Sequence, residues 1–304
     1  MYNKFFRFAE KPFEITPDPK LVYLSEQHQE ALSHLRYAVR EGKGFSVITG
    51  EAGTGKTTMV QVLLSELDGR VRTSFIFNPI LDQSDFLNYI CDDLGIKSEG
   101  LKSRGQSLRA LHNFLLDCFA KDEKVFLIID EAQSLKPELL QEVRLLTNLE
   151  TSKKKLLHVI LLGQPELDKT LDEESFRPLK QRITVRYHLR PLNRKETGEY
   201  IVHRLKRAGS RDIAIFDKNA VDKIYENSKG IPRLINIFCD NALLTGFSQE
   251  KNRIGKKIIL DVVRDLGSGK KSRKWFICSI IFAIAVAIGG LAIHFQEDIF
   301  RLWR

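Results

Sequence analysis

The segment Gly50 to Thr57, GEAGTGKT, limits the possible folds of this 304-residue chain more strongly than any other stretch. It matches the phosphate-loop pattern G-x-x-x-x-G-K-[ST]. The apolar residues 45–49 before it predict a buried strand, and residues 57–67 after it predict a helix with one apolar face. A glycine-rich turn between a strand and a helix points backbone N–H groups and the positive end of the helix dipole at one position. This context favours a phosphate-binding loop over a chance match.

The ligand that suits such a loop is ATP with Mg²⁺. We expect Lys56 to reach the outer phosphates and the hydroxyl of Thr57 to bind the metal. The nucleotide-binding residues are then those of the loop and the one that follows it, namely Gly50, Glu51, Ala52, Gly53, Thr54, Gly55, Lys56, Thr57 and Thr58.

A second nucleotide signature follows the apolar run at residues 125–129, which predicts a strand buried on both faces. This strand ends in Asp130 and Glu131. Asp130 would hold Mg²⁺ through water, and Glu131 would polarise the attacking water. A solvated acidic turn is the alternative for an isolated pair, but the phosphate loop favours the catalytic interpretation. The expected reaction is hydrolysis of ATP to ADP and phosphate.

Strand patterns alternate with helical patterns through the first two thirds of the chain. Strands are expected at 45–49, 71–77, 125–129, 156–162 and 183–189, with helices between them at 57–67, 85–94, 106–119 and 138–148. This alternation predicts an α/β fold, a P-loop NTPase core over residues 41–192 with a five-stranded parallel sheet and the ligand at the carboxyl ends of the strands. Gln164 follows the fourth strand. Its amide contacts the γ-phosphate or the attacking water there, or it is an ordinary loop residue.

The N-terminal segment, residues 1–40, is rich in aromatic residues and punctuated by prolines, and residues 27–40 have the pattern of a helix. We expect this segment to pack on the nucleotide-binding core. Two interpretations stay open: it packs on the adenine ring, or it covers only the edge of the core.

After residue 193 only helical patterns remain, which predicts an all-helical lid domain over residues 193–266. Its helices are expected at 195–208, 218–227, 232–247 and 254–266. Arg233 stands at the start of one of them, where an extra cation is slightly unfavourable without a partner. It is therefore either a phosphate contact or a surface arginine.

The 21 residues 275–295 contain no Asp, Glu, Lys or Arg. A helix of that length, at about 1.5 Å per residue, spans the ~30 Å hydrocarbon core of a bilayer. We therefore expect one C-terminal transmembrane helix in contact with lipid, between a basic juxtamembrane linker (267–274) and a short periplasmic tail (296–304). The positive-inside rule places everything before the span in the cytoplasm.

The formal net charge of +9 raises the possibility of a nucleic-acid partner. Seven of these charges lie in two clusters, at residues 270–274 and 153–155, so the rest of the chain is close to neutral. This distribution argues against a broad phosphate-binding face. The four cysteines show no C-x-x-C spacing, which predicts buried thiols in a reducing compartment rather than disulfides or a zinc site.

Several runs resemble the AAA+ ATPases of the general secretion pathway protein A (ExeA) type, over nearly all of the first 266 residues. The phosphate loop is common to a whole superfamily, but other runs are more specific. They include Asp130-Glu131-Ala132-Gln133, Leu145-Leu146-Thr147-Asn148-Leu149-Glu150, Leu161-Leu162-Gly163-Gln164-Pro165-Glu166-Leu167 and Gly230-x-Pro232-Arg233.

The resemblance implies roles for four residues. Gln164 takes the sensor-1 position, Arg233 the sensor-2 position of the helical lid, and Asn78 a switch position near Glu131. Arg182 matches the arginine finger of the superfamily; a structural arginine paired within the core is the alternative. The resemblance also implies a homo-oligomeric, ring-like ATPase at the bacterial inner membrane. Such factors work with a membrane partner protein on a secretin-type channel or a related pilus or exopolysaccharide export system.

One departure from the family concerns the C-terminal end. Relatives of this type carry a peptidoglycan-binding domain after the span, whereas nine residues follow it here. This argues against direct peptidoglycan binding and assigns that contact to a membrane partner.

Two other functions compete with the envelope ATPase. The first is a DNA-binding regulatory ATPase of the transposition-accessory type, which the basic residues 153–155 would serve but which has no use for the anchor at 275–295. The second is an ATP-dependent signalling scaffold with little turnover, which a hydrolysis rate would distinguish.

Overall fold

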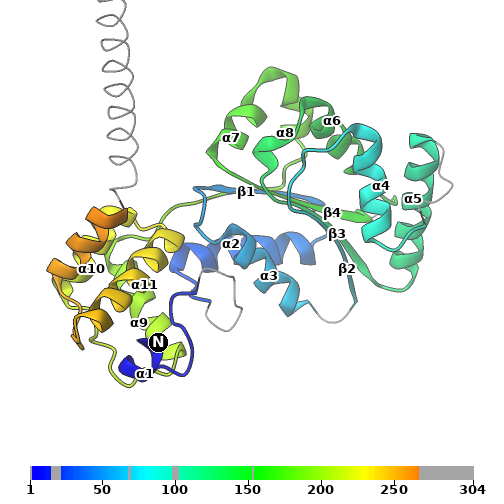
Figure 1. Cartoon of the computed structure of the whole chain (residues 1–304). Coiled ribbons are helices and arrows are strands. Elements are labelled where there is room, and N and C mark those ends of the chain that lie inside the picture. Colours follow the sequence, from blue (N-terminus) through cyan, green and yellow to red (C-terminus); the bar gives the residue numbers. More distant parts are fainter. Residues whose placement is uncertain (1, 15–21, 68–69, 98–102, 153, 267–304) are drawn as a thin grey trace, which may run out of the picture.

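A computed structural model describes residues 2–14, 22–67, 70–97, 103–152 and 154–266. They form a central sheet flanked by helices and, beside it, a smaller group of helices (Figure 1). The chain segment expected to span a membrane, 275–295, lies outside the described residues. Among the residues that are described, no helix is both long and apolar enough to cross a bilayer.

The sheet has five parallel strands in the order β2-β3-β4-β1-β5. Their bounds are β1 Phe45–Gly50, β2 Val71–Ile76, β3 Lys124–Ile129, β4 Leu157–Gly163 and β5 Val185–Leu189. Every residue of β1 and β4 is buried, because helices cover both faces of the central strands. The five-stranded parallel sheet predicted from the sequence is thus confirmed.

Helices cover the two faces of the sheet unequally (Figure 1). One face carries α2 (Glu26–Arg40) and α3 (Lys56–Glu66). The other carries α4 (Gln83–Asp93), α5 (Arg104–Ala120), α6 (Pro137–Leu146), α7 (Pro165–Asp172) and α8 (Arg177–Lys180), together with the short 3₁₀ turns η2 (Ala132–Ser134) and η3 (Glu174–Phe176). The crossover after β1 runs on the α2–α3 face and the later ones run on the opposite face. The chain therefore changes face after the phosphate loop, as ligand-binding α/β sheets do.

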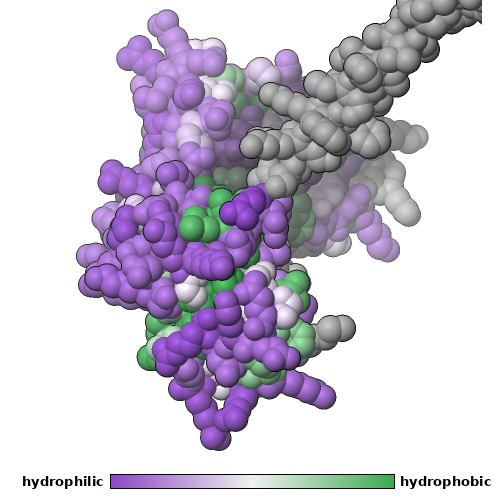
Figure 2. Space-filling model, turned by 60° about the vertical axis from the view of Figure 1, so that its left-hand side comes forward, coloured by the Kyte–Doolittle hydropathy of each residue, from purple (hydrophilic) through white to green (hydrophobic). Residues whose placement is uncertain are grey.

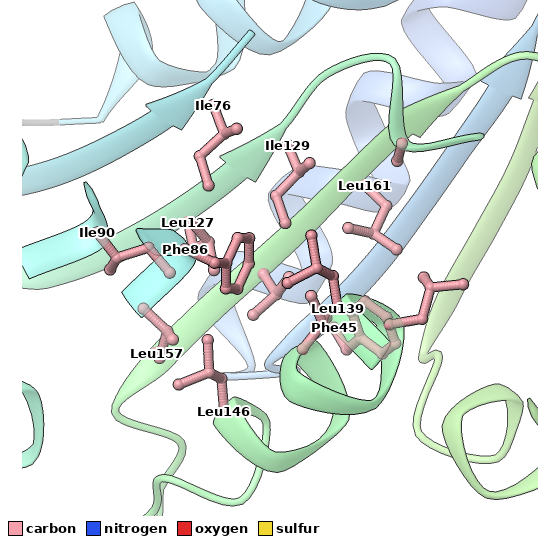
Figure 3. Close-up of a cluster of buried hydrophobic side chains, with 14 of the residues drawn as sticks. Phe45, Ile76, Phe86, Ile90, Leu127, Ile129, Leu139, Leu146, Leu157 and Leu161 are labelled. Carbon is pink, nitrogen blue, oxygen red and sulfur yellow. The ribbon is translucent and has the colours of Figure 1, made fainter. Parts of the chain in front are cut away.

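The larger hydrophobic core lies between the sheet and α4 to α8 (Figure 3). Alternate strand residues such as Phe45, Leu127 and Leu161 point into it, as the two-residue period of a strand requires. Phe86 and Leu139 reach it from α4 and α6. Intervening strand residues face α2 and α3 on the other side, so both sets of helices hold the strands in register.

The second group of helices, called the helical group here, has its own hydrophobic core. It consists of α1 (Tyr2–Phe6), α9 (Arg194–Arg207), α10 (Lys218–Ser228), α11 (Pro232–Ser248) and the helical residues 256–266. The Asn193 side chain and Glu196 form a reciprocal capping box that fixes where α9 begins. Viewed from the side of this group, the surface is mainly hydrophilic, with hydrophobic residues gathered near the middle of the face (Figure 2).

The N-terminal segment divides between the two cores, which differs from the expectation that all of residues 1–40 pack on the nucleotide-binding core. Phe6 and Phe13 are buried in the helical group, and only α2 packs on the sheet. The Arg204 guanidinium of α9 donates to the carbonyl oxygens of Pro12 and Glu14, at 2.5 and 2.9 Å. The reason is physical: the aromatic side chains complete an apolar surface formed by helices from the other end of the described chain.

Phe86 provides a test of the larger core. Its side chain is fully buried, so Phe86→Ala should lower the free energy of unfolding by about 3–5 kcal/mol, through lost burial and the cavity left behind. Urea denaturation followed by circular dichroism measures this change. Phe119→Ala, at a half-exposed position of α5, is the matched control and should change the free energy by less than about 1 kcal/mol. Equal losses for the two variants would contradict the packing described.

Candidate nucleotide-binding site

The loop between β1 and α3 depends on glycine at two close approaches. Gly53 has φ 83°, and a Cβ there would lie 2.6 Å from the Cβ of Arg233. Gly50 is the last residue of β1, and its Cβ would lie 2.4 Å from the carbonyl oxygen of Leu189. Backbone this close to its neighbours leaves room only for glycine. The loop therefore packs against β5 on one side and against α11 on the other.

Lys56 begins α3, and its side chain folds back under the loop. The Nζ atom donates to the carbonyl oxygens of Gly50 (2.8 Å) and Glu51 (3.1 Å). The residue is buried, and burial lowers the pKa of the Lys56 amine from its ordinary value, while the charges of Asp130, Glu131 and Glu51 oppose that shift. A buried cation whose hydrogen bonds go to neutral carbonyls is suited to bind an anion held by the loop.

The second half of the site comes from the carboxyl end of β3. Asp130 follows this strand, and its Oδ2 accepts a 2.5 Å hydrogen bond from the Thr57 hydroxyl. A hydroxyl and a carboxylate held side by side are oxygen ligands of the kind that Mg²⁺ prefers. The residues that the sequence assigns to phosphate and metal thus lie together in the fold.

Glu131 is held by two amide side chains. Its Oε2 accepts hydrogen bonds from Gln133 Nε2 (2.5 Å) and Gln164 Nε2 (3.1 Å), and Gln133 Oε1 accepts one from the backbone N–H of Gln164 (2.9 Å). Burial alone would raise the pKa of Glu131. The two amide hydrogen bonds and the charge of Lys56 outweigh burial, so this pKa lies below its ordinary value. The carboxylate is therefore ionised at neutral pH.

Lys56, Thr57, Asp130 and Glu131 face a cavity of about 490 Å³ between the sheet and the helical group, within the size range of small-molecule sites. Arg233 lines it from the first turn of α11, and its backbone N–H donates to the carbonyl of Gly53 at 3.3 Å. The lining also includes Tyr23, Tyr200, Asn236 and Arg204. The cavity thus combines cationic and hydrogen-bonding groups with aromatic side chains, the two kinds of surface that the phosphates and the base of a nucleotide require.

Of the candidate residues outside the loop, Gln164, Arg182 and Asn78 do not line this cavity, and of the loop itself the lining includes residues 53–58. Arg182 lies just before β5, at the end of the sheet opposite the phosphate loop, and its Nη1 donates to Asn148 Oδ1 and to Thr147 Oγ1 (3.2 Å). The ion pairs found in the described residues do not include Arg182. Asn78 follows β2 and is exposed, and it is not among the described residues that line the cavity.

Comparison with known proteins places the chain in a family. Residues 39–171 match the model of an AAA domain family. The general secretion pathway protein A of Aeromonas hydrophila is 44% identical over 257 residues, which cover 84% of this chain and 46% of that protein. Over these residues the chain matches the ExeA type of AAA+ ATPases. It spans less than half the length of this ExeA relative.

Solved structures share the fold at low sequence identity. The Aeropyrum pernix ORC2 protein, in a structure of its ADPNP and ADP complexes, has a TM-score of 0.66 and 15% identity, over 84% of this chain and 71% of that one. Drosophila ORC bound to DNA has a TM-score of 0.62 and 20% identity, over 85% and 65% of the two chains. At these identities the likeness to the two ORC structures shows only that the fold is shared.

Several residues that line or adjoin the cavity were not assigned from the sequence, and three of them make contacts that shape the site. His28 contacts the phosphate loop, Gln133 orients Glu131, and Arg204 fixes the backbone of the N-terminal segment. Gln133 lies two residues after Glu131, within a run that resembles the ExeA type, so the resemblance could have pointed to it as a site residue. His28 and Arg204 lie in helical patterns far from the loop in sequence, and only the folded chain brings them to it.

The hydrogen bonds from the two amide side chains to Glu131 lead to a testable prediction about the pKa of its carboxyl group. Substituting both Gln133→Ala and Gln164→Ala should raise the pKa of Glu131, because burial then acts with less opposition. Because the folded-state pKa is depressed, these hydrogen bonds stabilise the folded chain above the ordinary pKa of a glutamate, and that stabilisation is lost as pH falls through the lowered value. A ¹³C NMR titration of the carboxyl group measures the change. Gln181→Ala, an exposed amide, is the control; an unchanged Glu131 pKa in the double variant would contradict the assignment.

Proposed function

We propose that this chain is an ATP-hydrolysing AAA+ ATPase, anchored in the bacterial inner membrane, that assembles or remodels an envelope machine. The machine would be the secretin-type channel of general secretion, or a related pilus or exopolysaccharide export system. The observation that carries the ATPase activity is the convergence of Lys56, the Thr57–Asp130 pair, Glu131 and Arg233 around one cavity. We assign that activity to secretion because the relative from Aeromonas hydrophila is a general secretion pathway protein.

The donors of the loop would hold the nucleotide. The backbone N–H groups from Gly50 to Thr58 would surround the phosphates, and Lys56 would exchange its carbonyl partners for phosphate oxygens. Thr57 and Asp130 would hold Mg²⁺, which when bound neutralises charge on the phosphate oxygens. Arg233, next to Gly53, would add a second cation from the helical group, which would then act as a lid.

Glu131 would take the proton of the attacking water, because its carboxylate is ionised and faces the same cavity. Its hydrogen bonds to Gln133 and Gln164 occupy one carboxylate oxygen, so a small shift would present the other oxygen to the water. Gln164 would then be free to contact the γ-phosphate. Asn78, at the end of the strand next to β3, would offer Glu131 an alternative partner in another nucleotide state.

Arg182 would complete the site of a neighbouring subunit in a homo-oligomeric ring. Support comes from its position at the far end of the sheet from its own phosphate loop and from its neutral partners, Thr147 and Asn148. A guanidinium whose hydrogen-bond partners are neutral is not committed to a carboxylate, although the charge of Arg182 also acts on nearby Glu150.

The rival function, a DNA-binding regulatory ATPase, would use the basic residues 153–155. Among the two of these that the structure describes, Lys155 pairs with Glu150 and donates to the carbonyl of Thr147 at 2.9 Å. A lysine engaged in this way offers little to a phosphate backbone. This supports the envelope ATPase, in which residues 275–295 anchor the chain and an inner-membrane partner protein links it to the export complex.

The first prediction under this proposal separates binding from hydrolysis. Lys56→Ala should abolish binding of ATP, because it removes the buried ammonium of the phosphate site. Glu131→Gln should bind ATP normally and hydrolyse it about 10²- to 10⁴-fold more slowly, because it loses the general base. Nucleotide binding by calorimetry and phosphate release measure the two effects. Normal turnover by Glu131→Gln would remove this residue as the base.

The second prediction tests Arg182 across subunits. Arg182→Ala and Lys56→Ala chains should each be nearly inactive, since the loss of an arginine finger costs about 10³- to 10⁵-fold in rate in related chemistry. Mixing them should restore part of the ATPase activity, by pairing an intact loop with an intact arginine. Mixing Arg182→Ala with the Lys56→Ala/Arg182→Ala double variant is the control, because no subunit then supplies the arginine. Mixed oligomers that form without restored activity would refute the role.

The third prediction tests the membrane anchor. A reporter enzyme that folds only in the periplasm should be active when fused after Arg304, because the basic residues 270–274 precede the span. The same reporter fused after Leu266, before the span, should be inactive. Activity in the reverse pattern, or extraction of the full chain into buffer without detergent, would contradict the proposed topology.

A further inference from the structure

His28 connects α2 to the phosphate loop through both ring nitrogens. Its Nε2 lies 3.0 Å from the carbonyl oxygen of Thr54, and its Nδ1 lies 2.6 Å from the Oγ of Ser25, the residue that caps α2. The side chain is buried, with 5% of its surface exposed, and it lines the candidate nucleotide cavity. A buried polar side chain here contacts the loop that the proposed function depends on.

The partners of the ring fix its tautomer. A carbonyl oxygen can only accept, so the proton must be on Nε2, which donates to Thr54. The neutral ring then accepts from the Ser25 hydroxyl at Nδ1. Burial lowers the pKa of His28, which keeps this neutral form at physiological pH. The imidazole thus acts only as a hydrogen-bond donor to the loop, and Ser25, which caps α2, holds the ring in place.

The direction of this hydrogen bond determines where the next N–H of the loop points. In a trans peptide the C=O and the following N–H lie on opposite sides, and the described residues contain no cis peptide bond. Holding the Thr54 carbonyl against His28 therefore turns the Gly55 N–H away from the ring, and Gly55 lines the cavity. Within the described part of the chain, that N–H has no protein acceptor.

His28 also limits the space behind the loop. A Cβ on Gly55 would lie 3.2 Å from the ring Nε2, and Gly55 has φ 100°, a conformation that glycine alone adopts readily. The ring therefore packs directly against the backbone of Gly55. Without it, the Thr54–Gly55 peptide would lose the hydrogen bond to its own carbonyl, and only the neighbouring bonds of Thr54 and Gly55 would restrain the direction of its N–H.

We propose that His28 is a positioning residue for nucleotide binding, which orients the Thr54–Gly55 peptide so that the Gly55 N–H donates to a phosphate oxygen. This inference rests on the proposed nucleotide-binding function. The loop N–H groups contact phosphates that ADP and ATP share, so His28 acts on the affinity for both and leaves the hydrolytic step to Glu131. Its effect is on binding, whereas that of Glu131 is on turnover.

The test compares His28→Leu with His28→Gln in the full chain. Leucine removes the donor and should raise the Kd for both ADP and a slowly hydrolysed ATP analogue by about tenfold or more, as expected when one hydrogen bond to a charged group is lost. The turnover rate at saturating ATP should change by less than about threefold. Glutamine carries a side-chain N–H that can donate to Thr54, and it should recover most of the affinity.

Two control variants separate positioning from a general loss of stability. His34→Leu changes the same residue type on the exposed side of α2 and should leave both Kd values unchanged. Leu35→Ala, at a fully buried position of α2, should lower the melting temperature without a tenfold change in Kd.

The outcomes distinguish this inference from the function on which it rests. A wild-type chain that binds neither ADP nor the ATP analogue refutes the proposed function. A wild-type chain that binds both, with a folded His28→Leu variant of equal affinity, refutes the positioning role alone. The same conclusion follows if His28→Gln shows no recovery, or if Leu35→Ala weakens binding as much as His28→Leu does.

Discussion

The buried ammonium of Lys56 sets the conditions that the surrounding chain has to meet. A cation in that position is costly unless oxygen atoms surround it, and the loop supplies two carbonyls from its own backbone. The two carboxylates whose charges act most strongly on it come from the end of β3, which is separated from β1 by β4. Asp130 therefore reaches past the end of β4 to Thr57, and the parallel order of the strands is what brings these groups together.

The helical group and the sheet are joined on both sides of the cavity. Tyr23 donates to Glu199 of α9 at 2.9 Å, and five residues later His28 contacts the phosphate loop. On the other side, residues 190–193 lead directly from β5 into α9. A rotation of the helical group relative to the sheet would thus act on the backbone next to the loop through the Tyr23–Glu199 hydrogen bond, the connection at residues 190–193 and the contact of Arg233 with Gly53.

The sequence predicted what local periodicity and short motifs encode. The five strands and the phosphate loop lie where expected, because buried parallel strands are continuous apolar runs and the loop needs glycine at fixed positions. Helices α7 and α8 were not predicted, since each is only eight or four residues long and has too few turns to show a period. The partition of residues 1–40 and the contacts of His28 and Arg204 depend on surfaces distant in sequence, which a local pattern does not contain.

The docking of Tyr2 to Phe13 onto α9 and α11 determines how the molecule is divided. The core of the helical group is built from both ends of the described chain, with the entire sheet between them. In topological terms the P-loop core is an insertion into the helical group, rather than a first domain followed by a second. A ribosome releases residues 2–13 long before their helical partners, so these aromatic side chains have to wait for their packing partners until the sheet has been made. A cut at residue 193 would divide one hydrophobic core, not separate two.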